Sequence, residues 1–167
     1  AGVAFSTQPV VTVQDANGNT VTGSTASIAL TLTTGAGALG GTATMNAVNG
    51  VANFSGKNLS INLVGADKVL TASSSGLTAA TTSPAFTIIA GTATTIAVNA
   101  GNGQSATAGS AVATAPSVVV TDANGNPKQG VSVTFAVDSG GGLVDPISSV
   151  STDASGVAAV TSWTLGA

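Results

Sequence analysis

Two copies of one short motif carry the residues of this chain whose types and spacing best suit chemistry. Asp-Ala-Asn-Gly-Asn occupies residues 15–19 and returns at residues 122–126. Oxygen-bearing side chains at alternate positions are typical of the first half of a calcium-binding EF-hand loop. The calcium candidates are Asp15, Asn17, Asn19, Asp122, Asn124 and Asn126. Thr20 or Pro127 stands where that loop needs glycine, and no acidic residue closes it, so we expect tight turns and no bound metal.

The chain offers few groups for catalysis. It has no His, and its acidic residues are six Asp, most of them in segments that we expect to be turns. Asp in a turn commonly accepts hydrogen bonds from the backbone, and a nucleophilic Ser or Thr would need a base that no His can supply. Asp138 and Asp145 flank the glycine-rich residues 140–142 and form at best a weak pair. We therefore predict that the chain is not an enzyme and has no cofactor.

The lysines raise a different possibility, an amide crosslink between a lysine and an Asn or Asp side chain. Lys57, Lys68 and Lys128 are the candidates. Such a bond usually needs a buried acid beside the pair, and Glu is absent from the chain. We expect the lysines to be solvated at turns or strand edges, where they discourage pairing with other chains.

The composition indicates a packed, all-β chain. Hydrophobic residues make up 43% and charged residues 5%, which is the reverse of a disordered segment. No apolar run is long enough to span a membrane, because Thr, Ser, Gly and Asn interrupt every stretch. With a net charge of −3 and three Lys as its only cations, the chain is also a poor partner for nucleic acid.

Apolar residues alternate with polar ones, which predicts half-buried strands. Turn residues are expected at 17–18, 35–41, 49–50, 65–67, 124–125 and 140–142. Strands of this length and spacing favour antiparallel sandwiches. The expected strands cover residues 10–14, 27–33, 51–55, 68–73, 85–89, 94–98, 117–121, 131–137 and 157–165.

The repeated motif indicates two tandem modules. We place the first at residues 1–89 and the second at residues 90–167, with a short junction at Ile89–Gly91 that should hold them semi-rigidly. Few residues precede the motif in the first module, so we expect that module to lack its opening strand. The second stops soon after residue 165, so we expect it to lack its closing strands.

Residues 118–135 and 151–160 resemble the bacterial immunoglobulin-like repeat of the invasin and intimin type. Residues 1–89 are similar to a related repeat of long bacterial surface proteins. The resemblance implies two tandem immunoglobulin-like sandwiches in a rod or spacer segment of a secreted cell-surface adhesin or extracellular fibre. It also implies an extracellular, cell-surface location. The implied partners are neighbouring modules of the same or another chain and a host or cell-surface receptor.

Two alternative functions remain open at this point. Strands donated between chains could complete the end modules and build a filament. A glycan-binding module would need a row of exposed aromatics, and the chain has only Trp163 and four Phe, which fall at core-facing positions. Trp163 is the candidate binding residue, because its place in the alternation allows an outward orientation.

Overall fold

The computed structural model describes residues 1–82 and 84–167, which form two compact units, Ala1–Ile89 (unit 1) and Ala90–Ala167 (unit 2). The described residues contain no helix, and all strand pairs are antiparallel, which confirms the expectation of an all-β fold. The strands of unit 1 are β1 (Val10–Thr12), β2 (Ser27–Thr34), β3 (Leu39–Gly40), β4 (Thr44–Asn46), β5 (Val51–Asn53), β6 (Ser60–Ile61), β7 (Gly65–Ser73), β8 (Ala80–Thr81) and β9 (Phe86–Ile88). Those of unit 2 are β10 (Ala93–Ala100), β11 (Ser117–Asp122), β12 (Ser132–Val133), β13 (Gly142–Asp145), β14 (Val150–Ser151), β15 (Val157–Ala159) and β16 (Ser162–Leu165).

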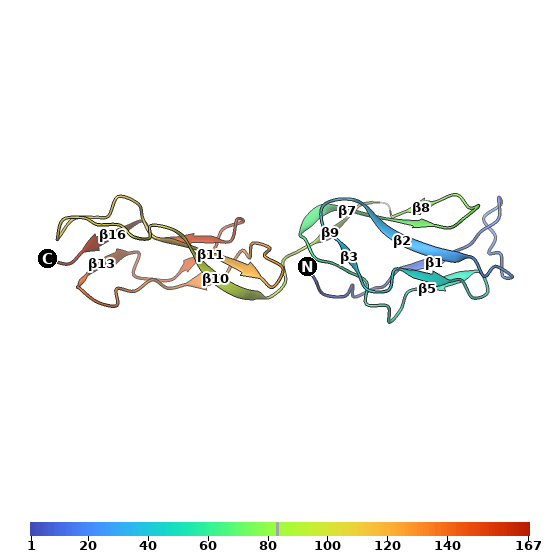
Figure 1. The fold of residues 1–167 in the computed structure, drawn as a ribbon, viewed down its shortest axis with the longest axis horizontal. Helices are drawn as coiled ribbons and strands as arrows, with labels where there is room; N and C mark the ends of the chain where they lie inside the picture. Colours follow the sequence, from blue (N-terminus) through green and yellow to red (C-terminus); the bar gives the residue numbers. More distant parts are fainter. Residues whose placement is uncertain (83) are drawn as a thin grey trace. The chain divides into compact units, whose positions relative to one another are not determined.

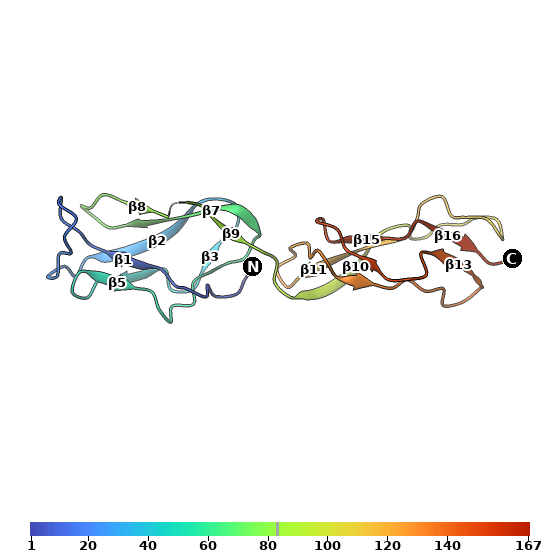
Figure 2. The same ribbon diagram turned by 180° about the vertical axis from the view of Figure 1, so that it is seen from behind.

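Unit 1 has two layers of strands. One layer follows the order β4-β2-β7-β8, with β9 also paired to β7, and the other contains β1 and β5. Both ribbon views show β7 and β8 on one side and β5 on the other, with β2 and β1 between them (Figures 1 and 2). The two layers therefore enclose the interior of the unit between their inner faces.

The core of unit 1 follows from the alternation along these strands. Ile28 and Leu30 of β2 point inward and pack with Ala52 of β5. Phe54 and Leu59 are fully buried in the same cluster. A Phe or Leu side chain contributes roughly 1.5–3 kcal/mol when it is fully removed from water, so these side chains anchor the two layers.

Unit 2 repeats part of this arrangement. Its largest sheet has the order β10-β11-β15, and two smaller pairs join β12 to β14 and β13 to β16. Its buried apolar cluster is centred on Val120, Val133 and Ala158. That cluster is smaller than the core of unit 1, because unit 2 has no described counterparts of β7, β8 and β9.

The sequence repeat extends to individual backbone hydrogen bonds. The amide of Val13 donates to Gly50 in unit 1, and the amide of Val120 donates to Gly156 in unit 2. A Cβ on Gly50 would lie 2.5 Å from the Val21 carbonyl oxygen, and both glycines have positive φ. Both units therefore need glycine where this turn packs against the strand that carries the repeated motif.

Several expectations about local structure were wrong, among them the turn at residues 35–41, since Leu39–Gly40 form β3. The expected strand at 131–137 is reduced to Ser132–Val133. In the described part of the chain β12 pairs with β14 alone, and no strand takes the place that β7 has beside β2. Residues 65–67 are not a turn; they begin β7, with an irregular register against β9. The expected strand at 157–165 is interrupted between Ala159 and Ser162, and its two halves join different sheets.

Candidate binding groove

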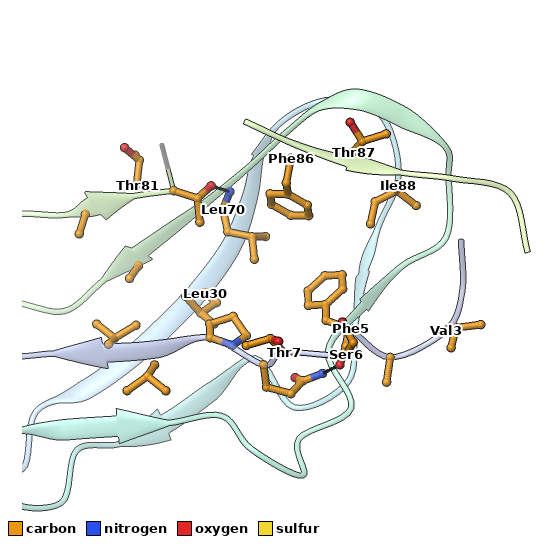
Figure 3. A pocket seen from close by; sticks show the side chains of 18 of the residues that line it. Val3, Phe5, Ser6, Thr7, Leu30, Leu70, Thr81, Phe86, Thr87 and Ile88 are labelled. Atoms are coloured by element: carbon orange, nitrogen blue, oxygen red, sulfur yellow. Dashed lines mark hydrogen bonds between the residues drawn. The ribbon is translucent and has the colours of Figure 1, made fainter. Parts of the chain in front are cut away.

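A groove of about 950 Å³ runs along β1 in unit 1. Its wall is formed on one side by residues leading into β1 and on the other by β8 and β9. Figure 3 shows Phe5, Leu30, Leu70 and Phe86 pointing into this space. The rings of Phe5 and Phe86 meet edge to face, with centroids 5.8 Å apart. The floor of the groove is therefore apolar.

One edge of β1 faces this groove without a neighbouring strand. Among the described residues β1 pairs with β5 alone. The amides of Val13 and Phe54 bond to Gly50 and Pro9, which makes Val11 and Val13 the residues whose backbone groups face β5. Because successive residues of a strand turn their peptide groups to opposite sides, the N–H and C=O of Val10 and Thr12 face the free edge.

A second hollow, of about 410 Å³, continues along the same edge. Val11, Thr12, Ala72 and Ala80 line both hollows. The two together follow β1 over its whole length and on to Asp15. The shape is therefore suited to an extended peptide lying along the strand.

Unit 2 contains a strand at the equivalent position. There β10 lies along β11, the counterpart of β1, with Ile96 opposite Val120, Ala97 opposite Val119 and Val98 opposite Val118. When the two copies of the repeat are aligned, Val13 of unit 1 is the equivalent of Val120 of unit 2. The groove of unit 1 is thus the space that β10 occupies in unit 2.

The inner side of β10 is itself uncovered. Ile96 is 58% exposed and Val98 63% exposed, although both lie on the same face as the buried Val120. A shallow hollow of about 380 Å³ lies beside Ile96, between β10 and β12. The cause is the same as for the small core, namely that no described strand of unit 2 takes the place of β7, β8 and β9.

Trp163, the candidate binding residue, lies on β16 opposite Val144 and is partly buried. Its carbonyl accepts the amide of Val112, as the carbonyl of the buried Leu59 accepts the amide of Phe5 in unit 1. The indole N–H is covered and has no hydrogen-bond partner among the described residues. Trp163 therefore takes the position that Leu59 has in unit 1, with its side chain partly exposed and its indole N–H covered.

The calcium candidates form two hydrogen-bonded turns. In the first, Asp15 Oδ1 accepts the amides of Asn17 and Asn19, and Oδ2 accepts Asn19 Nδ2 at 3.1 Å. The side-chain hydrogen bond from Asn19, followed by the amide bonds, lowers the pKa of Asp15. The side-chain nitrogen of Asn19, and not its oxygen, faces the Asp15 carboxylate. In this orientation the two side chains stabilise the turn and do not present a pair of oxygen ligands to a cation.

The second turn has the same internal bonds, a further one from Asn126 Nδ2 to Oδ1, and one from outside the turn. Asp122 Oδ1 accepts the amides of Asn124 and Asn126, and its Oδ2 also accepts the amide of Gly91 at 2.9 Å. Asp122 is only 3% exposed. Burial alone would raise its pKa, but the hydrogen bonds from Gly91, Asn126 and Asn124 outweigh it and hold the pKa at about 2. Across residues 1–82 and 84–167, no group of three or more acidic, His or Cys side chains is placed to hold a metal ion.

The expectation that the lysines are solvated is wrong for Lys68. Its side chain is completely buried, and its Nζ donates to the Ala36 carbonyl at 2.6 Å and lies 3.6 Å from Asp67 Oδ1. The stem passes close to Gly35 and Gly65, where a Cβ would lie 2.8 Å from Lys68 atoms. The two glycines make room for the lysine, a relation that strand alternation does not reveal.

No protein-family model matches the chain, and no curated protein matches it. Among solved structures, the chain is similar to the one titled "D0-D1 domain of Intimin". The match covers 95% of this chain and 75% of that one, at 20% identity and a TM-score of 0.34. That protein is of the family type that the sequence resembles, but a likeness at this level says nothing about function. In the described part of the chain, no helix is long and apolar enough to cross a membrane.

Proposed function

We propose that the chain is a non-enzymatic, structural segment of a secreted cell-surface adhesin or extracellular fibre, in which tandem immunoglobulin-like modules act as a rod or spacer. The observation that carries the proposal is the repetition of one module at the level of backbone bonds, as in the Val13–Gly50 and Val120–Gly156 pairs. Repeated modules multiply length and valency without creating a reaction centre.

The polar groups of the repeat support the same proposal. Asp15 and Asp122 accept hydrogen bonds from their own turns and so brace the backbone. Lys68 is enclosed within unit 1. These groups contribute to the rigidity of each module, which is what a spacer requires.

Single-molecule stretching of the chain tests the spacer role. A load-bearing segment should give two separate unfolding steps, one for each unit, and both should return after the force is released. Labelling of intact source cells with an antibody against the chain tests the location. Steps that never recover, or label that reaches its target only after the cells are broken, would contradict the proposal.

A second candidate function is a filament subunit that assembles by strand complementation between chains. The free edge of β1 and the apolar groove beside it favour this candidate. Light-scattering mass after size exclusion separates the two functions. A filament subunit forms a concentration-dependent series of head-to-tail oligomers, whereas a spacer remains monomeric.

A further inference from the structure

We propose that Asn102 is a site of spontaneous modification, at which the side-chain amide becomes a carboxylate through a cyclic imide formed with the backbone nitrogen of Gly103. The substrate is the chain itself, and water is the only co-reactant. The inference does not depend on the spacer role or on the groove of unit 1.

The chain contains four Asn-Gly pairs, at residues 17–18, 49–50, 102–103 and 124–125. In such a pair the backbone nitrogen of Gly can attack the side-chain carbonyl carbon of the preceding Asn. Gly favours this step because it has no side chain to obstruct the ring that forms. The residue after Asn is the same in all four pairs, so the folded structure decides which of them reacts.

Hydrogen bonds engage the attacking nitrogen in three of the four pairs. The acceptors are backbone carbonyls, at 3.1 Å from Asp15 to Gly18, 3.1 Å from Ser24 to Gly50 and 3.0 Å from Asp122 to Gly125. A backbone N–H that donates keeps its proton and its orientation. Each of these three glycines must therefore lose a hydrogen bond before its nitrogen can attack.

The pair at residues 102–103 has no such protection. Within the described part of the chain, the Gly103 amide has no acceptor and the Asn102 side chain has no partner. Both residues are exposed, and a Cβ on Gly103 would have no atom within 4 Å, so the ring has room to form. The bonds of this turn belong to its flanking residues, since Gln104 Nε2 donates to the Gly101 carbonyl at 2.9 Å.

The reaction balances without any oxidant or reductant. The Gly103 nitrogen gives up its proton and forms a bond to Cγ of Asn102, the bond from Cγ to Nδ2 breaks, and ammonia leaves with a proton. Water then opens the imide at one of its two carbonyl carbons. Opening at Cγ gives Asp, and opening at the backbone carbonyl gives isoaspartate, in which the main chain runs through the side chain.

The product changes the charge of a long neutral stretch. Residues 69–121 contain no Asp, Glu, Lys or Arg, and the whole chain has a formal net charge of −3. Either product places a new carboxylate in this stretch and makes the net charge more negative by one unit. The modification therefore has a readout that does not depend on its effect on stability.

The first test compares the four pairs in one sample. The folded chain is incubated at mildly alkaline pH, digested with pepsin at low pH, and analysed by mass spectrometry for Asn, Asp and isoaspartate at each pair. Asn102 should react at least about ten-fold faster than any other pair, because the others must first break a hydrogen bond. In urea, the matched control, the four rates should become alike. A second pair that reacts as fast as Asn102 in the folded chain, or equal slowing of all four pairs by folding, would overturn the proposal.

The second test removes the reactive side chain. Asn102→Gln keeps an amide, but its longer side chain would have to close a larger ring, which forms much more slowly. Isoelectric focusing of the aged wild-type chain should show an acidic band that the aged variant lacks, with circular dichroism showing that both are folded. An acidic band of equal intensity in the variant would place the modification elsewhere and refute the assignment.

The third test weakens the protection of another pair. Asp15→Ala removes the carboxylate that accepts the Asn17 amide, in a turn that is exposed. The rate at Asn17 should rise about five-fold, whereas the rate at Asn102 should stay the same. An unchanged rate at Asn17 in the folded variant would show that the hydrogen bonds of the turn do not control the reaction.

Discussion

Replacing Asp122 by Asn should destabilise unit 2 far more than replacing Asp15 by Asn destabilises unit 1. The two residues hold the same place in the repeat and brace the same turn. Asp122 is buried and also accepts the Gly91 amide, whereas Asp15 is exposed. In the Asp122→Asn variant, the side-chain amide nitrogen would face one of the backbone N–H groups that now donate to the carboxylate. Two hydrogen-bond donors would then face each other in a place that water does not reach.

The pKa of Asp122 gives the size of the effect. The pKa lies at about 2 in the folded chain, against an ordinary value of 3.8 for an Asp carboxyl. A difference of one unit between the folded and the ordinary pKa corresponds to about 1.4 kcal/mol, so the ionised carboxylate stabilises unit 2 by about 2 kcal/mol at neutral pH. Because the folded pKa is the lower one, this stabilisation is fully present above about pH 5 and is lost as the pH falls through 3.8 toward 2.

Urea unfolding followed by fluorescence measures this difference directly, because Trp163 is the only Trp of the chain and reports on unit 2. At pH 7 the Asp122→Asn chain should lose about 2 kcal/mol of unfolding free energy. The gap between wild type and variant should narrow as the pH is lowered to 2. A loss that stays the same at low pH would show that the charge of Asp122 is not the cause. Asp15→Asn, followed by circular dichroism, is the control and should give the smaller change.

Three further predictions concern buried positions. Lys68→Ala should cost unit 1 about 3 kcal/mol through the cavity it leaves, whereas Lys68→Met, which keeps the stem, should cost about 1 kcal/mol; equal losses would contradict the packing role. Gly50→Ala should unfold unit 1, because its Cβ would meet the Val21 carbonyl, while Gly76→Ala, with similar φ and open space, should cost about 1 kcal/mol as judged by circular dichroism. Trp163→Leu should change the stability of unit 2 by less than about 1.5 kcal/mol in thermal unfolding, since Leu stands at this position in unit 1; a larger loss would mean that Trp163 has a different environment.

The alternation of apolar and polar residues was sufficient to predict those strands that have a neighbouring strand to pair with. The alternation around Ile28 and Leu30 predicts an amphipathic strand, and β2 is that strand. The same alternation at residues 131–137 survives in the burial of the side chains, yet the strand is reduced to Ser132–Val133. Periodicity reports which face a residue presents, whereas a strand also needs a neighbour that supplies hydrogen bonds, and that neighbour is distant in sequence.

The candidate site was less accessible from the sequence. The repeat suggested that the first module lacks an opening strand, but it did not predict the groove. The floor of the groove is formed by Leu30, Leu70 and Phe86, which lie on three different strands. Lys68 was misplaced for a related reason. Its burial depends on space left by Gly35 and Gly65, and such complementarity exists only once the segments are packed together.

The sequence by itself determined the class of the chain, its two copies of one module and the turns that begin with Asp15 and Asp122. These features depend on side-chain size, polarity and backbone preference over a few neighbouring residues. The tertiary structure decided which strand edge is free, which apolar side chains stay uncovered and which carboxylate is held at a low pKa. Each of those properties depends on what lies across a sheet or beyond an edge, and residues far apart in the chain supply it.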